Sequence, residues 1–176
     1  MDHYSRTIIG FATFKKQPSS DEVIAFMAKA VRAVGMAPRH LISDQGTQFT
    51  SEALRTWCSE APRAIRQRFG TVGEYGSIAI VERPIRFVKE ECTRRILVPL
   101  RGEAMRTEMT LYIDWYNKHR SHQALGGRVP MSVYSGGEDE TLCFETRGKD
   151  GAIILLVVYG LNDRKHLPVV ELERAA

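Results

Sequence analysis

The chain has 176 residues, of which 43% are hydrophobic and 26% are charged, the balance of an ordinary globular protein. This length allows one cored domain with a small appendage. No apolar run approaches the ~20 residues that cross a bilayer, and the N-terminus lacks the apolar core of a signal peptide, so we expect a cytoplasmic protein with no membrane partner. The net charge of +4 favours an anionic partner only weakly, because many small enzymes are as basic.

The first half of the chain alternates predicted strands and helices. β-branched and aromatic residues alternate in the first strand, and apolar residues recur at helical spacing between Asp21 and Gly35. The predicted elements are a strand over 7–14, a helix over 21–34, a strand over 40–43, a helix over 51–60, a strand over 65–69 and a loop over 70–76. This alternation predicts an α/β layer fold.

The second half is predicted to be helical first and β-rich at its end. A long helix begins at Ile78, with an apolar face that runs through Val81, Ile85 and Cys92 to Ile96, and a second helix covers residues 102–119. Gly136 to Glu140 has the composition of a linker, and short strands are predicted over 142–147, 152–159 and 166–172. We therefore expect a core over residues 1–135 and a C-terminal β-rich segment over 136–176.

Asp44 stands directly after the predicted strand over 40–43. A side chain at that place projects into the crevice at the carboxyl edge of a sheet, where ligands bind in α/β folds. An aspartate before Gln45-Gly46 is also a common turn former, because its carboxylate can accept a hydrogen bond from the backbone two residues on. Taken alone, Asp44 is better explained as a turn residue.

Glu82 lies near the start of the long helix, where the helix dipole favours an acid. Glu82, Arg86, Lys89 and Thr93 follow one another at helical spacing and form one stripe opposite the apolar face. One acid followed by two bases suits a metal ion at one end and phosphates beyond it. The simpler alternative is a surface Glu–Arg pair worth roughly 0.2–0.5 kcal/mol.

Four segments resemble, in the correct order, the catalytic core of retroviral-type integrases and bacterial insertion-sequence transposases. They are Asp2 to Arg6 (DHYSR), Leu41 to Phe49 (LISDQGTQF), Phe69 to Arg83 (FGTVGEYGSIAIVER) and Trp115 to His122 (WYNKHRSH). Thirty-seven residues separate Asp44 from Glu82, which is close to the spacing in that family. The resemblance covers residues 2–134 and identifies Asp44 and Glu82 with the second and third catalytic acids.

This resemblance implies a ribonuclease-H-like mixed sheet flanked by helices, with a small C-terminal β segment. It implies DNA cleavage and strand transfer by phosphoryl transfer, with Mg²⁺ or Mn²⁺ held by Asp44 and Glu82. Arg83, Arg86 and Lys89 would bind DNA phosphates. The implied partners are transposon-end and target DNA, further copies of the chain and the full-length transposase, in a bacterial cytoplasm at the nucleoid.

The family's first catalytic aspartate belongs to a strand that precedes the segment resembling Asp2 to Arg6. Asp2 is therefore an alternative ligand, but the resemblance places it on the second strand, away from the metals. We expect a core that lacks its first strand and is impaired in strand transfer, because unpaired buried backbone groups cost about 1–3 kcal/mol each. The alternative is an inactive fragment that binds DNA or dimerises with the full-length transposase.

Three further features lead to predictions. A proline inside a helix costs about 3 kcal/mol, so we expect the helix that carries Pro84 to begin or kink near residues 80–81. The tail after Ser135 is either a β module that contacts DNA or a partner, or a hairpin packed on the core, which its mixed charge favours. An unrelated ribonuclease-H-like nuclease is a third class, but the Tyr116-Asn117 motif and the basic stripe speak against it.

Overall fold

The computed structural model describes residues 1–70, 77–99, 101–137 and 154–174. The chain forms two compact units, one made of Ile9–Arg86 and the other of Met1–Ile8 with Phe87–Ala176. Each unit has its own buried core. These units divide the chain after Ile8 and after Arg86. They do not test the predicted domain boundary at residue 135, which stays a prediction.

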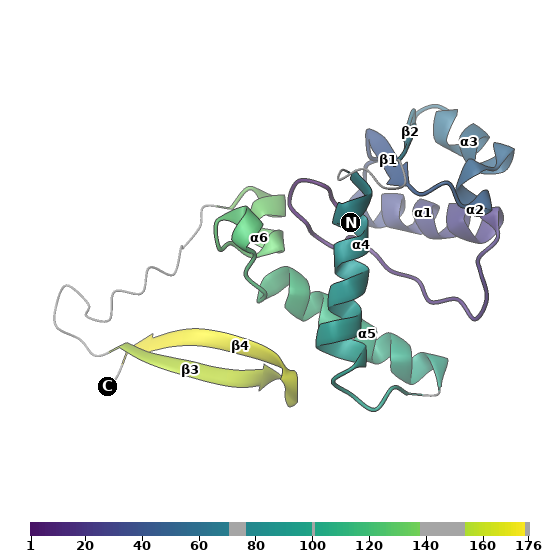
Figure 1. The fold of residues 1–176 in the computed structure, drawn as a ribbon. Helices are drawn as coiled ribbons and strands as arrows, with labels where there is room; N and C mark the ends of the chain where they lie inside the picture. The colour runs from purple at the N-terminus through teal and green to yellow at the C-terminus, as the bar shows by residue number, and fades with distance from the viewer. Residues whose placement is uncertain (71–76, 100, 138–153, 175–176) are drawn as a thin grey trace. The chain divides into compact units, whose positions relative to one another are not determined.

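The unit Ile9–Arg86 gathers α1, α2 and α3 around a pair of parallel strands (Figure 1). β1 and β2 pair in the register His40↔Arg66 to Ser43↔Phe69. The elements are α1 (Ser20–Val34), β1 (His40–Ser43), α2 (Thr47–Thr50), α3 (Glu52–Ser59), β2 (Arg66–Phe69) and α4 (Ser77–Phe87). The predicted strands over 40–43 and 65–69 and the helices over 21–34 and 51–60 are therefore confirmed to within a residue or two.

Helix α1 is bounded by the residues that its sequence signals indicate. The Ser19 hydroxyl accepts a hydrogen bond from the Glu22 amide, and the Glu22 carboxylate accepts one from the Ser19 amide, which is a complete capping box. Gly35 ends the helix at φ 82°, a backbone conformation that glycine adopts without strain. Between these caps, Val23 is buried and fixes the side of the helix that faces the core.

The core of this unit lies between α1, α3 and the strand pair. Its buried side chains are Val23, Leu54, Cys58 and Ile65, and Ile24, Met27, Ala37, Leu41, Phe49 and Trp57 pack against them. Leu41 thus turns one face of β1 toward the helices. Because successive side chains of a strand alternate between faces, His40 and Ile42 belong to the opposite face.

The predicted strand over 7–14 is wrong, since none of these residues takes part in a sheet within the described part of the chain. A strand needs a neighbouring backbone for its hydrogen bonds, and β1 is paired with β2 only. At Ile8, the Asn117 side chain replaces a neighbouring strand as the hydrogen-bond partner of the backbone. Its Oδ1 accepts the Ile8 N–H at 2.9 Å and its Nδ2 donates to the Ile8 carbonyl at 3.0 Å.

The second unit is organised around a 17-residue helix, α5, with a β hairpin against it. Met109, Tyr112 and Tyr116 are buried along this helix, as its apolar spacing predicts, and Trp115 is buried with them. The elements of the unit are η1 (Val88–Thr93, a π-helix), α5 (Gly102–Lys118), η2 (Gln123–Leu125), α6 (Pro130–Ser135), β3 (Ile154–Leu161) and β4 (Arg164–Arg174). The predicted strands over 152–159 and 166–172 are confirmed as β3 and β4, whereas 142–147 lies outside the described residues.

The C-terminal hairpin packs on α5, which confirms the hairpin alternative for the tail. The Trp115 indole N–H donates to the Pro168 carbonyl at 2.7 Å, and Arg164 pairs with Glu108 through two guanidinium nitrogens at 2.6 and 3.0 Å. Leu167 and Val169 are buried on the inner side. Val158 is 58% exposed, because it lies on the outer face of a hairpin that has one helix to pack on.

The helix that carries Pro84 differs from the prediction. It begins at Ser77, so Pro84 lies inside α4 and not within its first turn. Proline cannot donate a backbone hydrogen bond to the residue four positions earlier. One turn further on, at Val88, the backbone changes to the wider spacing of η1, where the Arg94 amide donates to the Lys89 carbonyl at 3.0 Å. The predicted apolar face therefore does not stay on one side, and Ile85 is 54% exposed while Cys92 is fully buried.

The cysteines that the structure describes, Cys58 and Cys92, are buried and form no disulfide. Burial raises the pKa of both thiols. Cys143 lies outside the described residues. Within the described ranges, the chain has no helix long and apolar enough to span a membrane.

Candidate functional site

Asp44 follows β1 and closes a turn with its own side chain. Its Oδ1 accepts the Gly46 N–H at 3.0 Å, and the Ser43 hydroxyl donates to the Asp44 carbonyl at 3.0 Å. The turn-forming role is therefore real, but it uses one carboxylate oxygen only. The side chain is exposed, and its Oδ2 has no partner among the residues that the structure describes. Asp44 can thus hold the turn and present an oxygen to a ligand at the same time.

Gly46 gives this turn its tight packing. A side-chain carbon at this position would lie 2.7 Å from Gln48 Nε2 and 3.0 Å from Asp44 Oδ1, so any larger residue would disturb the carboxylate. Beside the turn, a cleft of about 860 Å³ is lined by residues 13–20 with Glu22, Thr47 and Gln48. Lys15 and Lys16 contribute two exposed ammonium groups to it. This cleft could therefore bind a negatively charged chain. Its lining residues Thr47 and Gln48 follow Asp44 by three and four positions in the sequence.

Glu82 lies on α4 with an exposed side chain, and it makes no hydrogen bond or ion pair within the described part of the chain. The surface Glu82–Arg86 pair, which was the simpler alternative, is therefore not formed there. Arg83 and Arg86 are exposed on the same helix. Lys89 is exposed as well, but it belongs to η1 and to the other compact unit. The stripe predicted from α-helical spacing is thus one helix surface only as far as Arg86.

The two predicted metal ligands, Asp44 and Glu82, belong to the same compact unit. No hydrogen bond or ion pair of the described residues joins them, and no third acid, histidine or cysteine completes a metal-binding group within the ranges described. Exposed carboxylates without cationic partners are nevertheless suitable donors for Mg²⁺, which is bound in proteins through one or two carboxylates together with water and substrate phosphates. Asp44 and Glu82 thus have the type of oxygen donor that a hard divalent ion prefers.

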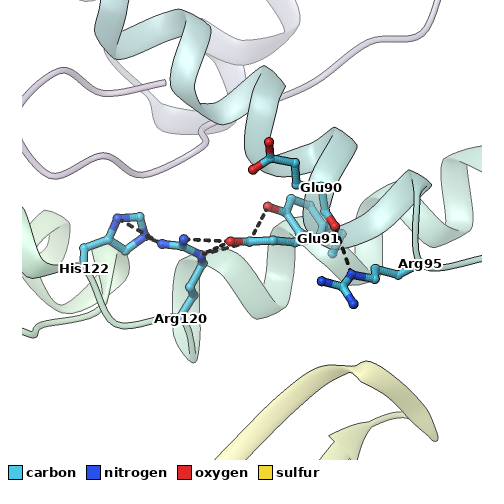
Figure 2. A network of polar contacts seen from close by, with 6 residues as sticks. Glu90, Glu91, Arg95, Arg120 and His122 are labelled. Atoms are coloured by element: carbon cyan, nitrogen blue, oxygen red, sulfur yellow. Dashed lines mark hydrogen bonds and ion pairs between the residues drawn. The ribbon is translucent and has the colours of Figure 1, made fainter.

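The segment Trp115 to His122 forms a partly buried polar network in the second unit (Figure 2). Arg120 lies between Glu91 and His122. Its guanidinium donates to both Glu91 oxygens at 2.7–3.1 Å, and Nη1 approaches the His122 ring at 3.3 Å. Arg120 also stacks on the Phe87 ring at 4.3 Å, and the Tyr112 hydroxyl donates to Glu91 at 3.1 Å. The motif thus links α5 to η1 through charge-assisted hydrogen bonds.

Sequence analysis missed Glu91, the acid that this network depends on. Glu91 stood inside the predicted long helix among other polar residues and had no distinguishing spacing. A usable signal was present at Arg120. An arginine that follows Trp115 and Tyr116 so closely requires an acidic partner if the aromatic rings are buried, because a buried charge is costly when unpaired.

Asp2 has a structural role at the start of the chain. Its Oδ2 accepts hydrogen bonds from the Ser5 amide at 2.7 Å and the Ser5 hydroxyl at 2.8 Å. Burial alone would raise the pKa of Asp2, but the hydrogen bonds from Ser5 and Tyr4 outweigh it and hold this pKa below its usual value. This geometry supports the structural reading of Asp2 over a role as metal ligand.

We expect His122 to make the stability of the chain depend on pH. The ring is 8% exposed, and burial together with Arg120 lowers its pKa to about 4. The unfolded chain takes up this proton near pH 6.5, so stability is full above that pH and falls as the pH drops toward 4, by roughly 3 kcal/mol for this group. His122→Phe, which keeps the edge contact with Tyr116, should lose less stability over this range in urea unfolding. Equal losses in both proteins would contradict the assignment.

Comparison with known proteins agrees with this geometry. Residues 1–74 match the model of the integrase core domain. The fold is similar to that of the catalytic core domain of BIV integrase, with a TM-score of 0.58 and 20% identity, over 76% of this chain and 81% of that one. It is also similar to a chain of the simian T-cell lymphotropic virus intasome in complex with a PP2A regulatory subunit, with a TM-score of 0.57 and 18% identity, over 94% of this chain and 57% of that one. No curated protein matches the sequence.

Residues 1–74 therefore resemble the integrase core domain, and the fold is similar to the ribonuclease-H-like fold of integrase catalytic cores. The predicted class, a mixed α/β fold with helices and small sheets, is confirmed. The family match includes Asp44 and ends before Glu82.

Proposed function

We propose that this chain acts on DNA by metal-dependent phosphoryl transfer, the chemistry of DNA cleavage and strand transfer. The observation that carries the proposal is the state of Asp44, which closes the turn after β1 with one oxygen and leaves the other exposed and unpartnered in the described structure. Glu82, exposed in the same unit, is the second acid. Transposon ends and target DNA would be the substrates, in a bacterial cytoplasm at the nucleoid.

Asp44 Oδ2 and the Glu82 carboxylate would hold the divalent ion, Mg²⁺ or Mn²⁺. When bound, such an ion lowers the pKa of an attacking hydroxyl and stabilises the charge on the leaving oxygen. The turn at Gly46 fixes the direction of the Asp44 carboxylate, so the ligand is oriented before the metal arrives. Their oxygen donors favour Mg²⁺ and Mn²⁺ over softer metals.

Cationic side chains around these acids would bind the DNA backbone. Arg83 and Arg86 are exposed one and four residues after Glu82 on α4, and Lys15 and Lys16 line the cleft beside the Asp44 turn. Lys89 is assigned to the same role from its place in the sequence motif. Arginine and lysine hold phosphates without reading sequence, which gives salt-dependent affinity for any DNA.

A second candidate is a chain that binds DNA or associates with further copies and with a full-length transposase without cleaving. The exposed side chains of Arg83, Lys15 and Lys16 favour it, because they can hold phosphates without a metal ion. In this case the cations remain functional and the carboxylates bind metal weakly. Association with a complete transposase would then interfere with transposition.

Nicking of supercoiled plasmid in Mg²⁺ or Mn²⁺ distinguishes the two candidates. Asp44→Asn is a sharp test, because an asparagine oxygen still accepts the Gly46 N–H and preserves the turn while the charge is lost. Asp21→Asn, an exposed acid on α1, is the matched control. Cleavage by the natural chain and by Asp21→Asn, but not by Asp44→Asn or Glu82→Gln, supports phosphoryl transfer. Metal-independent cleavage, or cleavage retained in Asp44→Asn, contradicts it, and DNA binding without cleavage supports the second candidate.

A further inference from the structure

The net positive charge of this chain belongs to one of its two units. Ile9–Arg86 contains eleven lysine and arginine residues and seven aspartate and glutamate residues, so it carries the whole net charge of +4. The other unit contains fourteen of each kind and is neutral. A surface for an anionic partner is therefore to be sought on the unit that contains Asp44.

Two arginines of this unit, Arg66 and Arg68, lie on one face of the strand pair. They are two residues apart in β2, so their side chains point to the same side. Gln67, between the two, points to the other side, where its amide donates to the Phe49 carbonyl at 3.2 Å. The side chains of Arg66 and Arg68 are exposed. We call these two residues the arginine face.

His40 shows that these charges act on one another. It pairs with Arg66 in the β1–β2 register, and burial, followed by the charges of Arg68, Arg66 and Arg39, lowers its pKa. Its Nε2 is buried and has no hydrogen-bond partner among the described residues. A histidine in these surroundings stays neutral at pH 7, so it neither adds to the charge nor compensates for it.

The arginine face has no acidic partner within the described part of the chain. Arg63, a few residues earlier, shows the usual alternative, because it pairs with Glu60 and stacks on Trp57 at 4.7 Å. Arg55 similarly pairs with Glu52 at 3.6 Å. Arg66 and Arg68 have neither an ion pair nor a ring contact in the described structure. Two cations left without partners on one small face attract a polyanion and gain from releasing its counterions.

We propose that the arginine face binds the phosphate backbone of duplex DNA and is a second contact surface beside Arg83 and Arg86. This inference rests on the proposed function, since it takes DNA as the substrate. Arg66 and Arg68 are two residues apart on a strand, so their Cα atoms are separated by about 6.6 Å. Phosphates follow at about 3.4 Å of axial rise on each DNA strand, so the two side chains span roughly two phosphate steps.

The position of the face relative to Asp44 gives it a role in substrate placement. Arg66 is level with His40 and Arg68 with Ile42 in the strand register, and Asp44 comes two residues after Ile42. Arg66 and Arg68 therefore lie one after the other along β2 in the direction of the turn that carries Asp44. A DNA backbone held by the arginine face is guided to the carboxyl end of β1.

The test is the salt dependence of DNA binding by the full chain, measured by fluorescence anisotropy. The probe is a short labelled duplex of arbitrary sequence, in EDTA so that metal at Asp44 and Glu82 plays no part. Arg66→Gln/Arg68→Gln should reduce the slope of log Kd against log salt by about 2 and weaken binding roughly tenfold or more at 0.1 M salt. The matched control, Lys29→Gln/Arg55→Gln, removes two exposed cations of the same unit and should stay within about twofold of the natural chain.

The possible outcomes separate this inference from the proposed function. Equal slopes for the arginine-face variant and the control overturn the inference. They do not bear on metal-dependent cleavage, which the plasmid nicking assay tests separately. Absence of DNA binding by the natural chain overturns it as well. Binding of poly-glutamate that depends on Arg66 and Arg68, with DNA binding unchanged, overturns it in favour of an acidic protein partner. Both side chains are exposed and unpaired, so circular dichroism and thermal unfolding should show intact variants.

Discussion

Replacing Arg120 by alanine is expected to lower the free energy of unfolding by about 3 kcal/mol. The side chains of Arg120 and Glu91 are only 20% and 27% exposed, so the pair is shielded from water on most sides. Its loss leaves Glu91 with the Tyr112 hydroxyl alone and removes the cation from the Phe87 ring. Urea unfolding of the full chain measures the effect.

Lys118→Ala is the matched control for this prediction, because Lys118 makes an ion pair with Asp114 at 2.6 Å on the same helix. Those side chains are 54% and 43% exposed, and such surface pairs contribute about 0–1 kcal/mol. Arg120→Lys should fall between the two, since lysine keeps the charge but not the two-pronged contact. Equal losses in Arg120→Ala and Lys118→Ala would show that the network does not stabilise the chain.

Asn117→Ala is expected to have a comparable effect, also about 3 kcal/mol. Asn117 is 6% exposed and satisfies both backbone groups of Ile8, and each buried group left without a partner costs about 1–3 kcal/mol. The variant should also loosen the Ile8 backbone from α5. Hydrogen exchange of the Ile8 amide measures this release directly, because protection requires the Asn117 acceptor.

Asn117→Asp separates lost hydrogen bonding from lost packing. An ionised aspartate accepts the Ile8 N–H but repels the Ile8 carbonyl, whereas a protonated one can donate to it. The variant should therefore be less destabilised, relative to the natural chain at the same pH, at pH 4 than at pH 7. A pH-independent loss equal to that of Asn117→Ala would assign the effect to packing alone.

Local signals in the sequence predicted much of the fold. The capping box at Ser19 and Glu22, the stop at Gly35 and the apolar spacing of α5 depend on neighbours within a few turns, and they define the helices correctly. The strand over 7–14 failed because a strand is completed by a partner far away in sequence. Here that partner is partly the Asn117 side chain, which no local pattern indicates.

The candidate site was predicted unevenly for a similar reason. The turn after β1 and the exposure of Asp44 follow from strand and turn chemistry, and the structure agrees with both. The stripe from Glu82 to Thr93 assumed one α-helical repeat, and the π-helix from Val88 changed the direction of every later side chain. The position of the arginine face relative to Asp44 needs the register of β1 with β2, which is set by pairing and not by either strand alone.

The central claim is that Asp44 and Glu82 hold one divalent ion together, and Mn²⁺ titration calorimetry on the natural chain, Asp44→Asn, Glu82→Gln and the double variant tests it most directly. Each single change should weaken Mn²⁺ binding by more than about tenfold, the loss that even outer partners of a metal site can cause. If the ion is shared, the double variant should be little weaker than either single one, because the first change already removes the site. Independent, additive losses, or unchanged binding in Asp44→Asn, would contradict a shared metal site.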